Sequence, residues 1–243
     1  FVVIGSFLYM TGKGLTTSKR QFLELLALGG VGYFALSSLY YASLLYISIP
    51  VQALIFYMYP ALVTMGSLAL GWEKASAPRV SSLLLALAGL YLVVNPIANV
   101  VLIGFLLAFC AAITYTMYIL ASTRPLRGVG GEVASFHVIG AAALSFLIYG
   151  SLTGRAHIAW SIQSWVWPIL IAIVSTAIAM TTFFQGLKLI GPSTASIISL
   201  IEPITSVIAA SLLFNEFLSA YQWIGGLLIL LAAAVAAISK SNV

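Results

Sequence analysis

The stretch that decides the fold runs from residue 192 to residue 214 and reads PSTASIISLIEPITSVIAASLLF. It is mostly apolar, with scattered Ser and Thr residues, and carries one charged residue, Glu202. Crossing ~30 Å of hydrocarbon takes about 20 helical residues, so this stretch is long enough to span a membrane. Glu202 lies about 18 Å along such a helix from Ile190, at a rise of ~1.5 Å per residue. The sequence therefore predicts a membrane helix with a carboxyl group near the middle of the bilayer.

The rest of the chain has the same character. Of its 243 residues, 62% are hydrophobic and 6% are charged, whereas about a quarter of the residues of a soluble domain are charged. Most of the surface must therefore face lipid. The Lys and Arg residues are scattered between apolar runs, which argues against a nucleic-acid partner. Lone Cys110 is interpreted as a small buried hydrophobe, and the chain has no pattern typical of a metal site or a cofactor site.

Apolar runs of membrane length recur along the chain and predict an all-α integral membrane protein. Complete spans are expected at 24–47, 50–72, 79–97, 101–122, 133–152, 166–189, 192–214 and 221–238. Residues Phe1 to Thr11 are apolar but too short to cross a bilayer. We expect them to be the end of a helix whose start lies upstream, which makes the sequence a fragment.

Basic residues divide unequally between the two sides of the predicted membrane. When successive loops are assigned to alternate sides, Arg155 falls on one side and nine basic residues fall on the other. The nine are Lys13, Lys19, Arg20, Lys74, Arg79, Arg124, Arg127, Lys188 and Lys240. Because cytoplasmic loops carry the excess of basic residues, the C-terminus is expected in the cytoplasm. If the native N-terminus is also cytoplasmic, the full protein has ten helices.

An internal repeat is visible at one fixed offset. Pro60 and Pro203 are 143 residues apart, and so are Glu73 and Glu216. Five spans separate the two copies, and because five is odd the copies have opposite orientations in the membrane. The sequence thus predicts two inverted repeats of five helices, residues 1–98 and 99–243, with the first repeat incomplete. Inverted repeats are common in secondary transporters, where they allow a central site to open to either side.

Pro60 and Pro203 lie near the middle of their spans. A proline there lacks its N–H and crowds the carbonyl four residues earlier, here that of Phe56 or Ser199. Each proline could be a tolerated packing kink. Their matching positions in inverted halves favour a second interpretation, in which both kinks border a binding site at the midplane.

Glu202 is the principal candidate for binding substrate or a coupling proton. A charge at this depth costs at least ~2.5 kcal/mol on insertion scales, so its side chain should face the bundle interior. The alternative is a neutral acid that is hydrogen-bonded between helices for structure. Tyr59 occupies the matching position in the first repeat, so the predicted site combines a carboxyl with a phenol. Further candidate members of the site are Gln52, Tyr115, Tyr118, Gln185 and Ser199.

Several of these polar side chains form helical stripes, and each could equally make an ordinary interhelical hydrogen bond. His137 has no acidic partner at helical spacing, so a structural role is expected. Glu73 and Lys188 lie near helix ends, where snorkelling toward the headgroups is the ordinary explanation. The sequence has no nucleophile arrangement and no nucleotide-binding domain, which argues against an enzyme.

Residues 191–196 (GPSTAS), Leu200-Ile201-Glu202-Pro203, Asn215-Glu216 and residues 223–226 (WIGG) resemble the EamA-type family of the drug/metabolite transporter superfamily. A weaker echo is found at Tyr59-Pro60 and in residues 71–73 (GWE). The resemblance implies ten helices in two inverted repeats with cytoplasmic termini. It also implies a carrier, commonly an exporter of amino acids or related metabolites that does not hydrolyse ATP.

The leading hypothesis is alternating-access transport of a small polar or amphipathic metabolite across the cytoplasmic membrane. A coupling proton and a second copy of the chain are candidate partners, besides the lipid bilayer. Two alternatives stay open, a non-transporting membrane scaffold or subunit and a passive channel.

Overall fold

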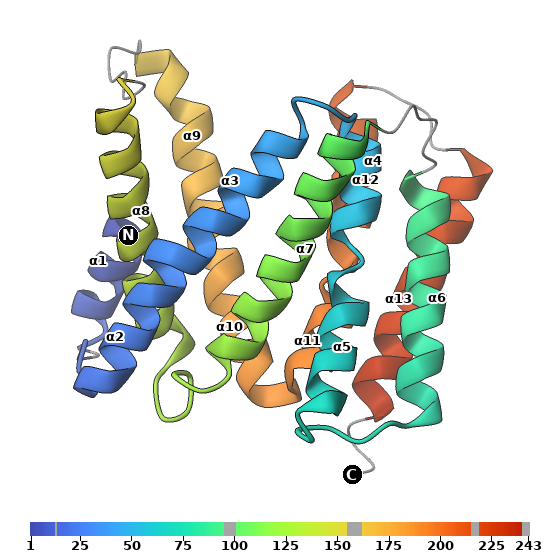
Figure 1. Cartoon of the computed structure of the whole chain (residues 1–243), viewed down its shortest axis with the longest axis horizontal. Coiled ribbons are helices and arrows are strands. Elements are labelled where there is room, and N and C mark those ends of the chain that lie inside the picture. The colour runs from blue at the N-terminus through green and yellow to red at the C-terminus, as the bar shows by residue number, and fades with distance from the viewer. Residues whose placement is uncertain (13, 95–100, 155–161, 215–218, 240–243) are drawn as a thin grey trace. The chain divides into compact units, whose positions relative to one another are not determined.

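The structure, a computed structural model, describes residues 1–12, 14–94, 101–154, 162–214 and 219–239. Across these ranges the chain is helical apart from turns and short connections, and it contains no β-strand (Figure 1). Six helical segments are long and apolar enough to cross a membrane. The all-α membrane fold that the apolar runs predict is confirmed.

Two compact units make up the chain, and each combines segments from both halves of the sequence. Unit 1 comprises residues 1–35 and 121–189, and unit 2 comprises residues 36–120 and 190–243. The expected boundary between the repeats, at residues 98 and 99, lies outside the described residues. The division into repeats at that point therefore stays a prediction.

Unit 1 is built from four helical segments. Its elements are α1 (Val2–Met10), α2 (Lys19–Ala27), η1 (Leu28–Tyr33), α8 (Gly131–Leu152), η2 (Ile162–Trp165), α9 (Val166–Ile171), η3 (Ala172–Ile178) and α10 (Ala179–Ile190). α2 begins earlier than the apolar run predicts, because Ser18 and Gln21 form a capping box that satisfies backbone N–H groups at its start.

The two π-helical turns, η1 and η3, are not signalled by the sequence. A π turn widens the helix and releases a carbonyl, and the carbonyl of Gly30 in η1 accepts a hydrogen bond from Ser145 Oγ of α8 at 2.9 Å. The neighbouring Gly29 permits close approach, because a Cβ there would lie 2.1 Å from the Val138 carbonyl oxygen. η1 and α8 are therefore packed backbone against backbone.

Unit 2 contains the segments that the repeat relates most closely. Its elements are α3 (Phe34–Ser43), α4 (Ile49–Phe56), α5 (Tyr59–Ala69), α6 (Ala77–Val94), α7 (Leu102–Ser122), α11 (Pro192–Ile198), α12 (Ile201–Phe214) and α13 (Ala220–Ser239). The offset of 143 residues maps the start of α4 onto the start of α11, and the start of α6 onto the start of α13. The two repeats thus share helix boundaries as well as prolines.

α6 and α13 lie side by side and run in opposite directions (Figure 1). A Cβ on Gly89 would lie 2.8 Å from Ile229, and one on Gly225 would lie 2.9 Å from Val93. Later residues of α6 thus contact earlier residues of α13, so the two helices are antiparallel. Glycine allows this close crossing, which is how helices without a hydrophobic driving force associate in lipid. The two helices that the predicted repeat pairs with each other are antiparallel.

Candidate substrate-binding site

A short break separates α4 from α5, and another separates α11 from α12. Pro60 is the second residue of α5, and Pro203 is the third residue of α12. The sequence predicts kinks in continuous helices, whereas the structure interrupts both helices. A proline in a first turn loses no hydrogen bond, because the N–H groups there have no partner within the helix. The Ser199 carbonyl, expected to be freed, accepts the Glu202 N–H at 3.0 Å.

A hydrogen bond between Tyr59 and Ser199 brings the two breaks together. The Tyr59 hydroxyl lies 2.5 Å from Ser199 Oγ, and Ser199 Oγ donates to the Ser196 carbonyl at 2.8 Å. Tyr59 is therefore the donor in this pair. Its side chain is 1% exposed. This is an interhelical hydrogen bond of the kind that the sequence left open, and it also positions the first residue of α5 beside α11.

Aromatic rings surround the first break. We call the rings of Tyr40, Phe56, Tyr57, Tyr59, Tyr115 and Tyr118 the aromatic cluster. The Tyr115 ring stacks on Phe56 with centroids 5.4 Å apart, and it meets Tyr59 edge to face at 4.6 Å. Tyr118 stacks on Tyr115 at 6.0 Å. Helix α7 thus supplies the two predicted site tyrosines to the same cluster as α4 and α5.

Glu202 lies in the first turn of α12 and faces this cluster. Its carboxyl is hydrogen-bonded to the Tyr57 hydroxyl. It also interacts electrostatically with the hydroxyls of Tyr40 and Tyr59. Glu202 remains exposed, unlike Tyr57 and Tyr59, which are buried. The phenols of Tyr40, Tyr57 and Tyr59 thus lie around the carboxyl of a residue that is itself exposed.

Gln52 is a buried amide in α4. Its side chain is 0% exposed, and within the described residues neither its amide nitrogen nor its amide oxygen has a hydrogen-bond partner. Leaving a buried polar group unpaired costs about 1–3 kcal/mol. A group that accepts and donates hydrogen bonds, such as water or a solute, would remove that cost.

Gln185 lies in unit 1, whereas the other predicted site residues lie in unit 2. Its amide donates to Glu132 Oε2 at 2.7 Å. Glu132 is 8% exposed and lies in the first turn of α8. The sequence does not predict it as a site residue. Lys188 donates to the Val129 carbonyl at 2.6 Å, so it is tied to protein rather than snorkelling. These contacts hold α10 against the start of α8.

Glu73 also differs from its predicted role. Both the hydroxyl and the backbone N–H of Ser193 donate to its carboxylate, the latter at 3.4 Å. Arg79 approaches the same carboxylate at 3.9 Å. Gly191, with φ 79°, leaves room for it, since a Cβ there would lie 2.8 Å from Glu73 Oε1. Glu73 therefore caps the start of α11 instead of snorkelling to the headgroups.

His137 and the acidic residues show no metal-binding arrangement among the residues whose positions are described. His137 Nδ1 lies 2.8 Å from the Val133 carbonyl of its own helix. Its ring contacts Phe22 and Phe136 edge to face, each with centroids 5.5 Å apart. These contacts are typical of a structural histidine.

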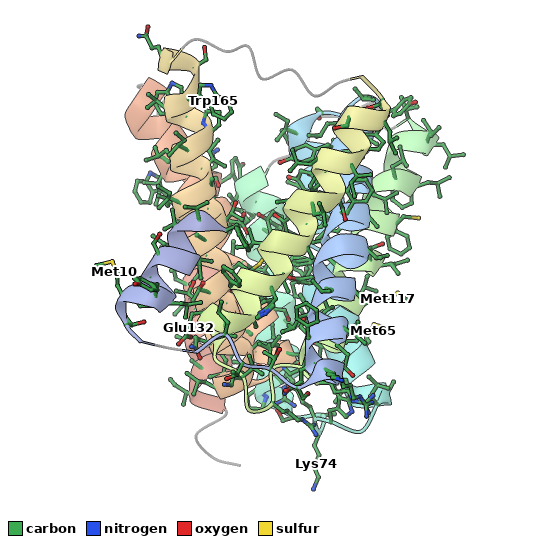
Figure 2. All side chains as sticks on the ribbon, turned by 90° about the vertical axis from the view of Figure 1, so that its left-hand side faces the viewer. Met10, Met65, Lys74, Met117, Glu132 and Trp165 are labelled. Atoms are coloured by element: carbon green, nitrogen blue, oxygen red, sulfur yellow. The ribbon has the colours of Figure 1, made fainter. Side chains whose placement is uncertain are left out.

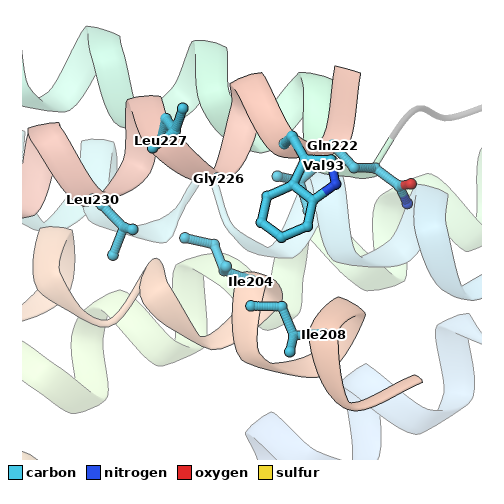
Figure 3. Close-up of a pocket in the computed structure, with 8 residues that line it drawn as sticks. Val93, Ile204, Ile208, Gln222, Gly226, Leu227 and Leu230 are labelled. Carbon is cyan, nitrogen blue, oxygen red and sulfur yellow. The ribbon is translucent and has the colours of Figure 1, made fainter. Parts of the chain in front are cut away.

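An apolar groove lies between α6, α12 and α13 (Figure 3). Its lining residues are Val93, Ile204, Ile208, Gln222, Trp223, Gly226, Leu227 and Leu230. The Gln222 oxygen already accepts the Ser219 backbone N–H at 2.9 Å. A groove with so few polar groups is a poor match for a polar solute, so it is not the candidate site.

Apolar helices with paired breaks, and with polar groups gathered at those breaks, are the architecture of a multi-pass membrane transporter. Residues 102–238, more than half of the chain, match the model of the EamA-like transporter family. The chain belongs to this family, which confirms the resemblance seen in its motifs.

Two relatives and one solved structure are consistent with this assignment. An uncharacterized transporter of Archaeoglobus fulgidus is 28% identical over 212 residues, covering 87% of this chain and 75% of that protein. The uncharacterized transporter YcbK of Bacillus subtilis is 24% identical over 206 residues, covering 81% of this chain and 66% of YcbK. A crystal structure with 23% sequence identity has a TM-score of 0.83, covering 98% of this chain and 84% of that one. The last match shows a shared fold.

Proposed function

We propose that the protein exports a small polar or amphipathic metabolite by alternating access. The process involves no chemical step, because the substrate leaves the site unchanged. The two inverted repeats exchange conformations, so that a site near the bilayer midplane opens first to one side and then to the other.

The observation that carries this proposal is the meeting of the two helix breaks. Tyr59, at the start of α5, is hydrogen-bonded to Ser199, at the end of α11. Tyr57 and Glu202 make a second link across the same breaks. Discontinuous helices expose backbone groups and side chains at the depth where transporters of this plan bind substrate. Both links lie within unit 2.

The proposed site consists of Glu202, Tyr59, Gln52, Tyr115, Tyr118 and Ser199. Glu202 binds substrate or a coupling proton, and Tyr59 and Ser199 hold the breaks in register. Tyr115 offers ring surface, and buried Tyr118 stacks against it. Gln52 offers an amide whose donor and acceptor are unused among the described residues. Gln185 is bonded to Glu132 in unit 1 and is proposed as a helix tie that contributes to binding indirectly.

The excess of basic residues on one side supports a cytoplasmic C-terminus and residence in the cytoplasmic membrane. The export direction rests on the motifs shared with the EamA-type family. A proton and a second copy of the chain are the proposed coupling ion and protein partner.

The test is transport by the full-length protein in proteoliposomes. Vesicles preloaded with one metabolite should accumulate its labelled form by counterflow, and the rate should saturate with concentration. Glu202→Gln should lower this rate or change its pH dependence. Glu24→Gln is the matched control, because Glu24 pairs with Arg20 on the exposed start of α2.

Other results would contradict the proposal in different ways. Flux that never saturates and shows no counterflow indicates a channel. Stoichiometric co-purification with another protein, without flux of any metabolite in a library, indicates a scaffold. If Glu202→Gln leaves both rate and pH dependence unchanged, the role given to Glu202 is wrong.

A further inference from the structure

Glu202 is an acid without a basic side chain to neutralise it in the described part of unit 2. The basic residues there are Lys74 and Arg79. Arg79 lies 3.9 Å from Glu73, and Lys74 extends away from the helices (Figure 2). Acidic residues within membrane spans pair with a cation or mark a substrate pathway, because an isolated charge in lipid is costly. No basic side chain in the described part of unit 2 therefore supplies a counter-charge for Glu202.

The surroundings of Glu202 are suited to a particular kind of counter-charge. The faces of aromatic rings carry negative potential and attract cations, especially ammonium groups. Phe56 and Tyr115 are both partly exposed, and their rings stack at an interplanar angle of 18°. Tyr59, by contrast, is fully buried and bonded to Ser199. Phe56 and Tyr115, with partly exposed Tyr40, are therefore the rings of the cluster that a solute can touch, and Tyr59 positions them.

The same surroundings disfavour an anionic group. A carboxylate on the solute would meet the like charge of Glu202, and neither Lys74 nor Arg79 is placed to bind it. A zwitterion such as an amino acid would thus satisfy its ammonium group and leave its carboxylate unpaired. A simple amine with an apolar body leaves no charge unpaired.

We propose that this site selects small organic cations, with the Glu202 carboxylate as counter-ion and the rings of Phe56 and Tyr115 as the apolar and cation–π surface. This inference rests on the proposed transport function and specifies its substrate class. It predicts that an amine is preferred over both a neutral analogue and a zwitterion of the same shape.

Three probes with one phenyl ring separate these possibilities: 2-phenylethylamine, 2-phenylethanol and phenylalanine. Their apparent affinities are measured as half-saturation or inhibition constants in counterflow with the full-length protein. We expect the amine to bind at least ~10-fold more tightly than the other two, since a desolvated charge pair is worth more than this factor. Glu202→Gln should weaken the amine at least ~10-fold and leave the alcohol within about twofold.

The rings are tested by a matched pair of variants. Tyr115→Leu removes the ring face and should lower amine affinity about 2- to 30-fold, the range of a cation–π contact, whereas Tyr115→Phe keeps the ring face and should lower it less. These variants also keep the test valid if Glu202→Gln fails to fold, which size-exclusion profiles and thermal melting would reveal.

The outcomes distinguish this inference from the function on which it rests. Saturable transport with equal affinity for amine, alcohol and zwitterion overturns the cation preference and leaves the transporter intact. Unchanged amine affinity in Glu202→Gln, with a flattened pH profile, makes Glu202 a proton carrier and also overturns it. If no probe or metabolite shows saturable flux, the proposed function itself fails.

Discussion

The two helix breaks occupy equivalent positions but present different chemistry. At the offset of 143 residues, Phe56 corresponds to Ser199 and Tyr59 corresponds to Glu202. The first break thus contributes aromatic rings, and the second break contributes a hydroxyl and a carboxyl. In the proposed inverted repeat, duplication accounts for the shared geometry, and divergence of a few residues accounts for the asymmetry of the proposed site. An inverted-repeat protein can therefore keep a symmetric mechanism of movement while binding an asymmetric solute.

The helices leading into the breaks also begin differently. Ser48 precedes α4 in an extended conformation and makes no side-chain cap. Gly191 precedes α11 with a positive φ, and α11 is capped from outside by Glu73 of the first repeat. The start of α11 is therefore held by a carboxylate from another helix, whereas Ser48 gives the start of α4 no side-chain cap.

The largest expected effect comes from making the two breaks alike. Glu202→Tyr places a tyrosine at both equivalent positions and removes the acid from the site. Losing one partner of a desolvated charge contact costs roughly 2–5 kcal/mol, or about 30-fold or more in transport efficiency. Initial counterflow rates in proteoliposomes measure the loss. The same substitution at Glu24, which pairs with exposed Arg20, should leave transport within about twofold. Equal losses at both sites would show that the carboxyl at the second break has no special role in transport.

The next effect concerns the cap of α11. Glu73→Ala removes an acceptor for two Ser193 donors, and hydrogen bonds to charged groups contribute about 1.5–3 kcal/mol each. We expect a fall in thermal stability equivalent to about 2 kcal/mol, measured by melting of the purified protein in micelles. Glu24→Ala, which breaks an exposed pair with Arg20, should cost less than about 1 kcal/mol. A Glu73 variant as stable as the Glu24 variant would mean that the cap does not stabilise α11.

Much of the fold follows from the sequence because its signals are local. Apolar runs locate the spans, and Pro60 and Pro203 locate the breaks, since a proline affects its own helix. The bonds Gln185–Glu132 and Glu73–Ser193 join residues far apart in the chain. Helical spacing tells which residues share a face, but it does not tell which faces meet.

The candidate site was predicted unevenly for the same reason. Tyr59, Ser199 and Glu202 lie beside the prolines, so the repeat pointed to them, and the structure brings them to the same breaks. Gln185 was selected for the polar face of its helix, and its amide bonds to Glu132. Phe56 and Tyr57 were not selected as site residues, although a cluster of aromatic residues before Pro60 was the available signal.

A smaller effect is expected at the bond that joins the breaks. Tyr59→Phe keeps the ring and removes the hydroxyl that donates to Ser199. Ser199 Oγ still donates to the Ser196 carbonyl, so the loss is one neutral hydrogen bond, worth about 1 kcal/mol. Thermal melting should show this loss, and Tyr41→Phe, at a side chain 68% exposed, should leave melting unchanged. Equal melting of the two variants would show that the Tyr59 bond does not hold the breaks together.

The smallest effect is expected at the prolines, although they revealed the breaks. Pro60 is the second residue of α5 and Pro50 is the second residue of α4, where a missing N–H costs nothing. Pro60→Ala should therefore lower stability by less than about 1 kcal/mol, chiefly because proline restricts the unfolded chain. Pro50→Ala is the matched control, since α4 follows a loop and not a break. Similar melting and similar transport in both variants would mean that Tyr59 and its contacts maintain the break. A loss of transport confined to Pro60→Ala would mean that α4 and α5 fuse without the proline, and that the proline itself maintains the break.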